Sequence, residues 1–431
     1  MDAHGPAQAG LSRPADEPPL AADAGAVPRS VPVPVPVPGR VGRPVERVLL
    51  GASIALVAFN LRPVFSSVSA VLPEVLASTG LSPSGASWLT ILPVLCLGAF
   101  APLAPGLARR FGAERVLLAV LLFVALGTGL RGLADVPALF AGSALAGVGI
   151  AVGNVLLPGL VKRDFAGQAA LMTGVYTMAL CAGAAAGAGL TVPAARALGG
   201  SWAGALAVWA VPALVAALVW APWVARAAPP AGRAARAVRG LWRDPLAWQV
   251  TLFMGLQSSL AYSIFGWLAP ILRARGMEAA AAGAAVSVSV MFQVVACLFV
   301  PPIAARCRDQ RLVCVALTAI AVVALLGLLF APLSAVWVWS AVQGIGQGGL
   351  FAAAMTLIVL RSPDAQVAAQ LSGMAQGVGY VLAAGGPLLV GVLRDRTGGF
   401  EAAAWLFVAL GLGCVLSGLG AGRAVQVRAG A

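Results

Sequence analysis

The stretch SALAGVG at residues 143–149 recurs as SAVQGIG at residues 340–346, and this match indicates the fold of the chain. Both copies lie inside long apolar segments and are 197 positions apart. The same offset carries Arg109 onto Arg306, each of which follows an apolar segment. The second half of the chain therefore repeats the first, and each copy should form the same arrangement of helices.

The composition predicts an all-α integral membrane protein. Hydrophobic residues make up 60% of the 431 residues and charged residues only 10%, and the mean hydropathy is +0.93. Apolar runs long enough to cross a bilayer follow one another from Val48 to Ala421, which excludes a soluble globular protein. The net charge of +13 does not indicate a nucleic-acid partner, because the basic residues are spread between the apolar segments. The expected partners are the lipid bilayer and a small solute.

We predict twelve transmembrane helices, six in each half of the chain. Because six is even, both halves enter the membrane in the same direction, which makes them parallel repeats. The predicted spans of the first half are 48–76, 84–107, 115–133, 137–161, 168–192 and 202–224. Those of the second half are 247–272, 279–305, 312–331, 335–360, 366–393 and 400–421.

The spans divide the chain into five parts. Residues 1–45 are rich in Pro, Ala and Gly and favour extended polyproline II, so we expect a disordered cytoplasmic tail; a polyproline ligand for a partner domain is the alternative. An N-terminal six-helix half (46–225), a basic cytoplasmic linker (226–246), a C-terminal six-helix half (247–422) and a short cytoplasmic tail (423–431) follow.

The basic residues also predict the orientation. Most of the 28 Lys and Arg fall on the side of the N-terminus. The opposite side holds only Arg131, Arg196, Arg273, Arg275, Arg394 and Arg396. By the positive-inside rule both termini are cytoplasmic, in an inner or plasma membrane that the chain crosses many times.

Neither a metal site nor an enzyme is expected. The six cysteines show no disulfide or metal-ligand spacing, and the single histidine, His4, lies in the tail. No nucleophile with a base or metal cluster is evident at membrane depth, and no soluble effector domain favours a receptor. We therefore expect a monomer that needs neither metal nor cofactor.

One charge lies deep in the first span, within Asn60-Leu61-Arg62-Pro63. Arg62 is about 21 Å along a helix that starts at Val48, in a hydrocarbon core about 30 Å thick. A lone cation there costs about 2.5–3.5 kcal/mol on insertion scales. Backbone carbonyls could satisfy it, and Pro63 frees the carbonyl of Phe59 for this purpose. The alternative is a water-filled cavity, where the guanidinium binds an anionic or strongly dipolar substrate.

Other polar side chains at membrane depth are Asn60, Gln257, Tyr262, Gln347, Gln376 and Tyr380. Each alone is more typical of a hydrogen bond between helices than of a ligand contact. Glycine-rich runs at 147–153, 183–187 and 344–349 lack the preceding strand of a nucleotide-binding motif, so we interpret them as close helix packing.

Two parallel six-helix halves joined by a basic linker resemble the architecture of the major facilitator superfamily. Within it, the Asn60–Pro63 run and the run Leu371–Tyr380 are similar to signatures of the CynX/NimT family of cyanate and 2-nitroimidazole transporters. The resemblance covers residues 46–421. It implies transport of small solutes and a central cavity lined by spans 1, 4, 7 and 10. As a group, the residues expected to bind substrate are Arg62, Asn60, Gln257, Tyr262, Gln347, Gln376 and Tyr380.

The segment after span two, from Pro105 to Arg115, resembles the superfamily's gating loop. The expected gating residues are Arg109, Arg110, Gly112, Glu114 and Arg115. Arg109 stands where the superfamily has an aspartate, so Glu114 is the candidate for the missing carboxylate. The alternative is a simple positive-inside anchor.

These patterns predict a secondary active or facilitated transporter that works by alternating access. Its solute would be a cyanate-like anion, a small carboxylate or a nitroimidazole-like compound. The alternative is a multidrug or metabolite efflux transporter of the same superfamily, and a membrane receptor is the weaker alternative. No carboxylate lies near the middle of a span, so Glu74 at the outer end of span one is the candidate for proton coupling.

Overall fold

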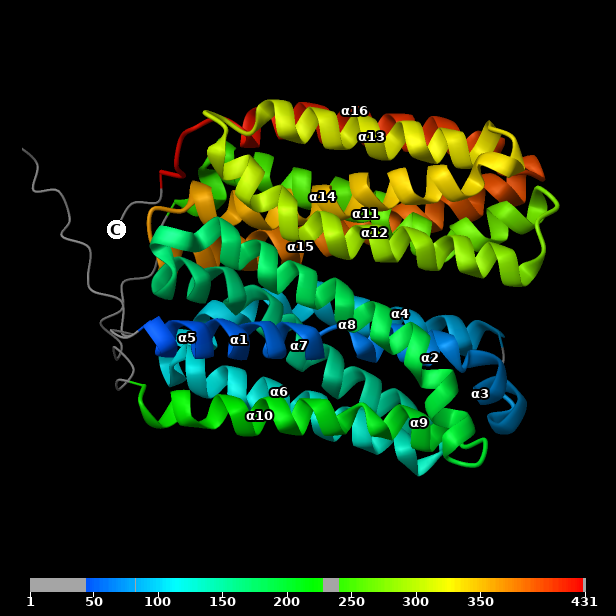
Figure 1. Cartoon of the computed structure of the whole chain (residues 1–431), viewed down its shortest axis with the longest axis horizontal. Coiled ribbons are helices and arrows are strands. Elements are labelled where there is room, and N and C mark those ends of the chain that lie inside the picture. The colour runs from blue at the N-terminus through cyan, green and yellow to red at the C-terminus, as the bar shows by residue number, and fades with distance from the viewer. Residues whose placement is uncertain (1–43, 82, 228–239, 429–431) are drawn as a thin grey trace, which may run out of the picture. The chain divides into compact units, whose positions relative to one another are not determined.

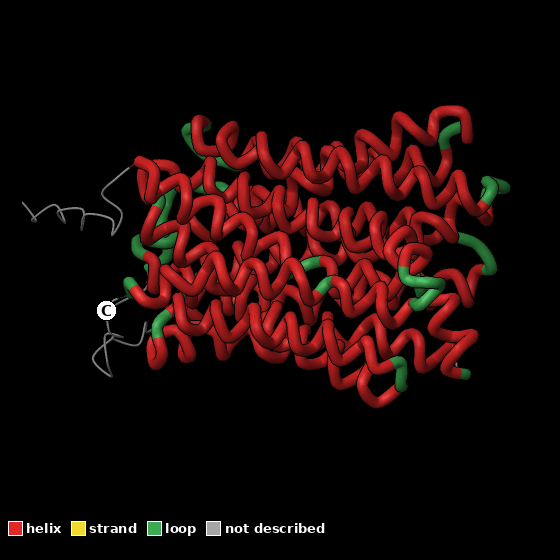
Figure 2. The backbone as a smooth tube through the Cα atoms, turned by 60° about the horizontal axis from the view of Figure 1, so that its bottom comes forward, coloured by secondary structure: helices red, strands yellow, loops and turns green. Residues whose placement is uncertain are grey.

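The computed structural model describes residues 44–81, 83–227 and 240–428. In these ranges the chain consists of helices joined by short turns, which Figure 2 shows as red tubes with green connections. The predicted disordered tail, apart from Pro44 and Val45, lies outside the described residues, as do residues 228–239 of the predicted linker.

Helices α1 to α10 form the N-terminal half, in the lower part of Figure 1. Their bounds are α1 Pro44–Asn60, α2 Pro63–Ala70, α3 Leu72–Thr79, α4 Pro83–Phe100, α5 Ala104–Phe111, α6 Ala113–Leu130, α7 Val136–Asp164, α8 Ala169–Ala197, α9 Trp202–Val208 and α10 Ala210–Ala225.

Helices α11 to α16 form the C-terminal half, in the upper part of Figure 1. Their bounds are α11 Pro245–Ala274, α12 Ala279–Arg306, α13 Arg311–Phe330, α14 Val336–Arg361, α15 Ala365–Thr397 and α16 Glu401–Ala421. Among the described residues, 12 helical segments are long and apolar enough to cross a membrane, which confirms the predicted number of spans. An even number returns the chain to its starting side. We call the side where α1 begins and α16 ends the terminal face, and the opposite side the far face.

The repeated stretches pack in equivalent ways in the two halves. Gly149 of α7 lies against α6, and its counterpart Gly346 of α14 lies against α13. Gly147 lies against α4, and its counterpart Gly344 lies against α12. In each of the four places an added Cβ would come within 3.1 Å of a neighbouring helix. The glycines therefore let backbones approach closely, as small residues do in membrane proteins.

Two predicted segments differ from the structure. The first span was expected to run without interruption over 48–76, but the helix breaks between Asn60 and Pro63 and again at Val71. The gating segment was expected to be a loop, yet most of it is helix α5, and the chain turns at Gly112. Gly112 has a φ of 87°, a conformation that glycine adopts without strain.

Acidic side chains cap helices at the ends of the bundle. Asp135 accepts a hydrogen bond from the amide of Ala138 at the start of α7, Asp244 caps α11, and Asp364 caps α15. Such caps satisfy amides that have no partner inside the helix.

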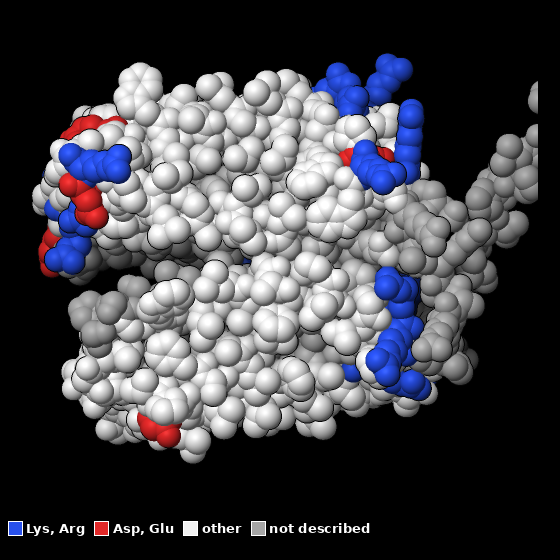
Figure 3. Space-filling model, turned by 180° about the vertical axis from the view of Figure 1, so that it is seen from behind, with Lys and Arg blue, Asp and Glu red and all other residues white. Residues whose placement is uncertain are grey.

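Figure 3 shows coloured charged groups at both ends and a broad uncharged surface between them. The membrane-spanning helices carry exposed apolar side chains such as Leu126, Leu218 and Trp405, as expected where lipid replaces water.

The two halves contact each other through small residues. Toward the terminal face, Gly159 of α7 lies against the carbonyl of Ala365 of α15. At a similar depth, Gly174 of α8 lies against the carbonyls of Cys297 and Leu298 of α12. The hydroxyl of Thr177 donates to the carbonyl of Cys297 at 3.3 Å. These contacts join α8 of the N-terminal half to α12 of the C-terminal half.

Candidate functional site

The break between α1 and α2 places Arg62. Pro63 has no N–H, so the carbonyl of Phe59 loses its helical donor. Gly183 of α8 packs directly on this carbonyl group, because an added Cβ would lie only 3.0 Å from the Phe59 carbonyl carbon. One turn on, an added Cβ at Gly187 would lie 2.9 Å from the Cα of Pro63. The glycine pair therefore forms the packing face that the sequence predicts, and it holds α8 against the break.

Arg62 lies in a cavity between the two halves. Its guanidinium carbon is 5.2 Å from the centre of the Phe351 ring of α14, which is a cation–π geometry. The Nε atom has no hydrogen-bond partner among the described residues. The carbonyl of Phe59 is therefore not the partner of this nitrogen, although Pro63 frees it.

The cavity has a volume of about 50 Å³. On this measure a site needs about 10–15 Å³ to hold one water, so there is room for a few waters or one small solute. Its wall comes from the α1–α2 break and α8 on one side, and from α11, α12, α14 and α15 on the other. Arg62 is the one charged side chain that lines it in the part of the chain that the structure describes.

Five of the seven predicted binding residues line this cavity, namely Arg62, Gln257, Tyr262, Gln347 and Tyr380. The rings of Tyr262 and Tyr380 meet edge to face, with 6.2 Å between their centres. The amide of Gln347 donates to the main-chain carbonyl of Gln257 at 3.1 Å and lies 3.3 Å from its side-chain oxygen. The predicted group thus surrounds Arg62 with two hydroxyls and two amides.

Asn60 and Gln376 do not line the cavity. The amide of Asn60 donates to the carbonyl of Leu56 in its own helix at 2.8 Å. The amide of Gln376 donates to the carbonyl of Asn154 of α7 at 3.1 Å and so connects the two halves. Both side chains are buried. Asn60 therefore bonds within its own helix, and Gln376 bonds between the halves.

Sequence reasoning missed Phe351 and Cys181 as cavity residues. Phe351 follows Gln347 by four positions on α14, so helical periodicity could have placed it on the same face. Cys181 of α8 lies 3.5 Å, sulfur to sulfur, from Cys297 of α12. That contact crosses between the halves, and nothing in the spacing of the two cysteines indicates it.

The predicted gating residues gather at the terminal face, outside the cavity. Glu114 forms an ion pair with Arg163 at the end of α7, with 2.9 Å between the charged atoms. Arg163 also pairs with its neighbour Asp164. Glu114 and Asp164 are therefore the carboxylates that pair with Arg163 at this corner. Arg109 is half-buried, whereas Arg110 and Arg115 are exposed.

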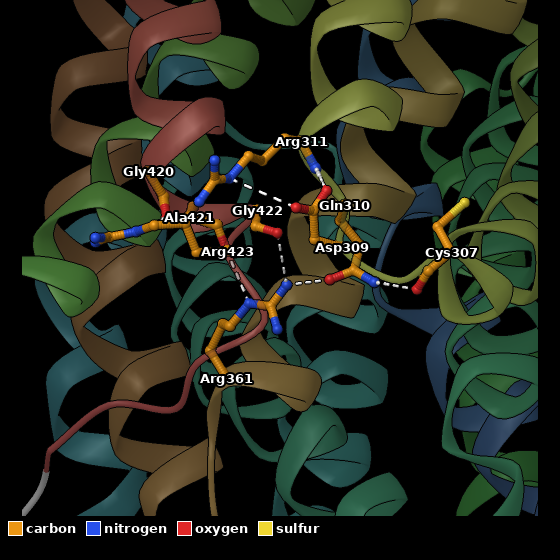
Figure 4. Close-up of polar contacts among 9 residues, drawn as sticks. All are labelled: Cys307, Asp309, Gln310, Arg311, Arg361, Gly420, Ala421, Gly422 and Arg423. Carbon is orange, nitrogen blue, oxygen red and sulfur yellow. Dashed lines mark hydrogen bonds and ion pairs between the residues drawn. The ribbon is translucent and has the colours of Figure 1, made fainter.

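The equivalent corner of the C-terminal half has an amide in place of the carboxylate (Figure 4). Arg361 at the end of α14 donates to the carbonyl of Ala421 at 2.8 Å and to that of Gly422 at 3.2 Å. It also donates to the side-chain oxygen of Gln310, which precedes α13. After α16, the amide of Val427 donates to the carbonyl of Arg361 at 2.9 Å. These bonds attach the chain after α16 to the end of α14.

Two further charges lie apart from the cavity. Glu74, the candidate for proton coupling, is exposed on α3 at the far face. Arg131 follows α6 on the side opposite the terminal face, where the sequence predicts it, and its side chain is only 1% exposed. It donates to the carbonyl of Val64 in α2 at 2.9 Å, a contact between segments far apart in sequence.

No cluster of three His, Cys, Asp or Glu that could hold a metal occurs within the described ranges.

Comparison with known proteins adds three findings. Residues 50–341 match the family model described as Major Facilitator Superfamily. The sequence is 39% identical to a 2-nitroimidazole transporter of Escherichia coli (strain K12), over 89% of this chain and 98% of the relative. It is 30% identical to the cyanate transport protein CynX of the same organism, over 83% of this chain and 92% of the relative.

The architecture is also similar to a solved structure. The proton:xylose symporter XylE, with 6-bromo-6-deoxy-D-glucose bound, matches with a TM-score of 0.70. The match covers 86% of this chain and 94% of that chain, at 12% identity. At such low identity the likeness concerns the arrangement of the helices alone.

Proposed function

This chain belongs to the Major Facilitator Superfamily of transporters, and from that premise we propose that it carries a small anionic or strongly dipolar solute between its two halves. Transport would proceed by alternating access, in which the halves rock about a site near mid-membrane. Arg62 would be the charged partner of the solute, with Gln257, Gln347, Tyr262 and Tyr380 as the polar wall.

The observation that carries this proposal is the guanidinium of Arg62, whose Nε has no hydrogen-bond partner among the described residues, in a cavity with no carboxylate in the described part of its lining. A cation at membrane depth is costly unless something neutralises it. A guanidinium presents two parallel N–H groups, which suit the oxygens of a carboxylate, a nitro group or another small oxyanion. The solute itself is the natural counter-charge.

Size and relatives support the same class of solute. A cavity of about 50 Å³ suits a molecule of a few heavy atoms and gives no support to a broad-range drug exporter. The relatives named for 2-nitroimidazole and for cyanate match the chain along most of its length. Both compounds are small, and each carries electronegative atoms that a guanidinium can bind.

We also propose the orientation and setting. The excess of basic residues toward the terminal face supports cytoplasmic termini in an inner or plasma membrane. The protein would act as a monomer. It would perform no covalent chemistry on its solute, because the described side chains that line the cavity include no nucleophile paired with a base.

The test is uptake into proteoliposomes by Arg62→Ala and Arg62→Lys. We expect Arg62→Ala to lower uptake about a hundredfold or more, since it removes two charge-assisted hydrogen bonds. Arg62→Lys should restore little of the uptake rate, because an ammonium cannot donate two parallel hydrogen bonds as a guanidinium does. Arg196→Ala, which removes an exposed arginine at the end of α8, is the matched control and should transport normally. Normal uptake by Arg62→Ala would refute the proposal.

Coupling to protons is a separate question, and Glu74 is the residue to test. In proteoliposomes with and without a pH gradient, a glutamate-borne coupling predicts that Glu74→Gln makes uptake insensitive to the gradient. Because Glu74 is exposed at the far face and does not line the cavity, we expect the variant to respond to the gradient as the unmodified protein does. Transport would then be facilitated diffusion, or the proton would cross the membrane bound to the solute.

A further inference from the structure

The orientation of the Gln347 amide is fixed by its contacts. Its nitrogen lies 3.1 Å from the main-chain carbonyl oxygen of Gln257. A carbonyl can only accept a hydrogen bond, so the NH₂ group of Gln347 must face α11. The side-chain oxygen of Gln347 is left without a hydrogen-bond partner among the described residues, although the side chain is 1% exposed.

The neighbouring amide is oriented by the same logic. The nitrogen of Gln257 donates to the carbonyl of Met254 at 3.1 Å and to the hydroxyl of Ser258 at 2.8 Å. Its oxygen lies 3.3 Å from the nitrogen of Gln347. Both NH₂ groups are therefore engaged inside the protein. What the pair retains for a solute is an acceptor, the oxygen of Gln347.

Arg62 and Gln347 thus offer opposite hydrogen-bonding roles in one small cavity. A guanidinium has donors only. The cavity of about 50 Å³ has room for one small solute, and both side chains line it, so a single solute that fills it reaches both. Phe351, one turn after Gln347, lies under the guanidinium and adds an aromatic face beside them.

We propose that the cavity selects solutes that join an anionic or nitro group to an N–H or O–H donor, with Arg62 binding the first and the Gln347 oxygen the second. This inference rests on the proposed function and narrows it. A solute without a donor would leave the buried Gln347 oxygen unsatisfied, and sites built around a hydrogen bond reject analogues that lack it.

The experiment compares solute pairs of nearly equal size in proteoliposomes, with protein-free vesicles as the blank. One pair is 2-nitroimidazole and 2-nitrothiazole, in which a ring sulfur replaces the N–H. The other is 4-hydroxybenzoate and 4-fluorobenzoate, in which fluorine replaces the O–H. The unmodified protein should take up the donor-bearing member of a transported pair at least about tenfold faster, the effect of leaving one buried acceptor unpaired.

Gln347→Met removes the acceptor at similar volume and should reduce this preference to less than about twofold. The matched control is Gln343→Met, one turn earlier on α14. Gln343 accepts a hydrogen bond from Ser289 and does not line the cavity. Its replacement should leave the preference unchanged, whatever it does to the overall rate.

The outcomes separate the two proposals. Equal uptake of both members by the unmodified protein overturns the selectivity of Gln347 and leaves the proposed function in place. A preference that survives in folded Gln347→Met also overturns it. If no member of either pair enters faster than in protein-free vesicles, the proposed class of solute fails, and this inference fails with it. If Gln347→Met does not fold, the proposal is judged on the unmodified protein alone: a preference for the donor-bearing solute supports it, and equal uptake overturns it.

Discussion

Two arginines of this protein, Arg62 in the cavity and Arg361 at the terminal face, lie within the helical bundle in opposite electrostatic surroundings. The Nε of Arg361 donates to a main-chain carbonyl, and one of its terminal nitrogens donates to another carbonyl and to Gln310. The Nε of Arg62 has no such partner, and its guanidinium faces an aromatic ring. One cation is enclosed by acceptors of the protein, whereas the Nε of the other has no acceptor among the described residues.

The comparison shows how a structural cation is recognised. Arg361 is 5% exposed, and its acceptors come from α16 and from the turn before α13, so it joins three parts of the C-terminal half (Figure 4). Acceptors that lose a buried, charged donor are left unsatisfied, which destabilises the fold. Removing a cation that has fewer acceptors leaves fewer groups unsatisfied and relieves the cost of desolvating the cation itself.

The largest effect on stability should come from Arg361→Met. The variant leaves the carbonyl of Ala421 and the side-chain oxygen of Gln310 without the charged donor, so we expect a loss of about 3 kcal/mol in the free energy of unfolding. Thermal unfolding in detergent, followed by tryptophan fluorescence, would measure it. Arg62→Met is the matched variant and should unfold at the same temperature or higher. If the two variants lost equal stability, the distinction between the two arginines would fail.

A smaller effect is expected from Gly183→Val, which alters the setting of Arg62 without changing a charge. The new side chain collides with the carbonyl of Phe59 and pushes α8 away from the helix break. Overpacking of this kind costs about 1–3 kcal/mol, and uptake should fall because Arg62 shifts.

The control for that variant is Gly189→Val on the same helix, where an added Cβ meets nothing within 4 Å. It should match the unmodified protein in unfolding temperature and in uptake. Full activity of Gly183→Val would show that the break tolerates displacement and that Arg62 does not depend on it.

The smallest effect should follow Phe351→Leu, which removes the aromatic partner of Arg62 but keeps an apolar surface. A cation–π contact contributes about 0.5–2 kcal/mol, so the apparent affinity for solute should fall about two- to thirtyfold. Initial uptake rates over a range of solute concentrations would give this value. Phe299→Leu, at an exposed position on α12, is the control. An unchanged affinity in Phe351→Leu would show that the Phe351 ring does not contribute to solute binding.

Much of the fold could be predicted, because each span had to carry its own apolar run. The match between residues 143–149 and 340–346 identified the repeat, and the glycines within it pack on equivalent helices. The break at Asn60–Pro63 was not predicted as a break. It depends on whether another helix stabilises the freed carbonyl, and only the packing of Gly183 shows that one does.

The site was predicted in part for a similar reason. Arg62, Gln257 and Gln347 stand out in a sequence because polar groups are rare in apolar spans. Phe351 does not stand out, since an aromatic residue in a span suits lipid equally well. Asn60 was expected in the cavity, but it bonds to a carbonyl of its own helix. That choice depends on a side-chain rotamer, which residue type alone does not determine.

The lone charge of the cavity has an electrical consequence. Without solute, the described lining of the cavity carries the charge of Arg62 and no carboxylate, whereas a bound monovalent anion makes it neutral. Moving one elementary charge across a membrane is worth about 2.3 kcal/mol per 100 mV. With an anionic solute the membrane voltage therefore acts on the return of the unloaded protein, and with a neutral, dipolar solute it acts on both steps. The voltage dependence of the flux would thus reveal the charge of the natural solute before its identity is known.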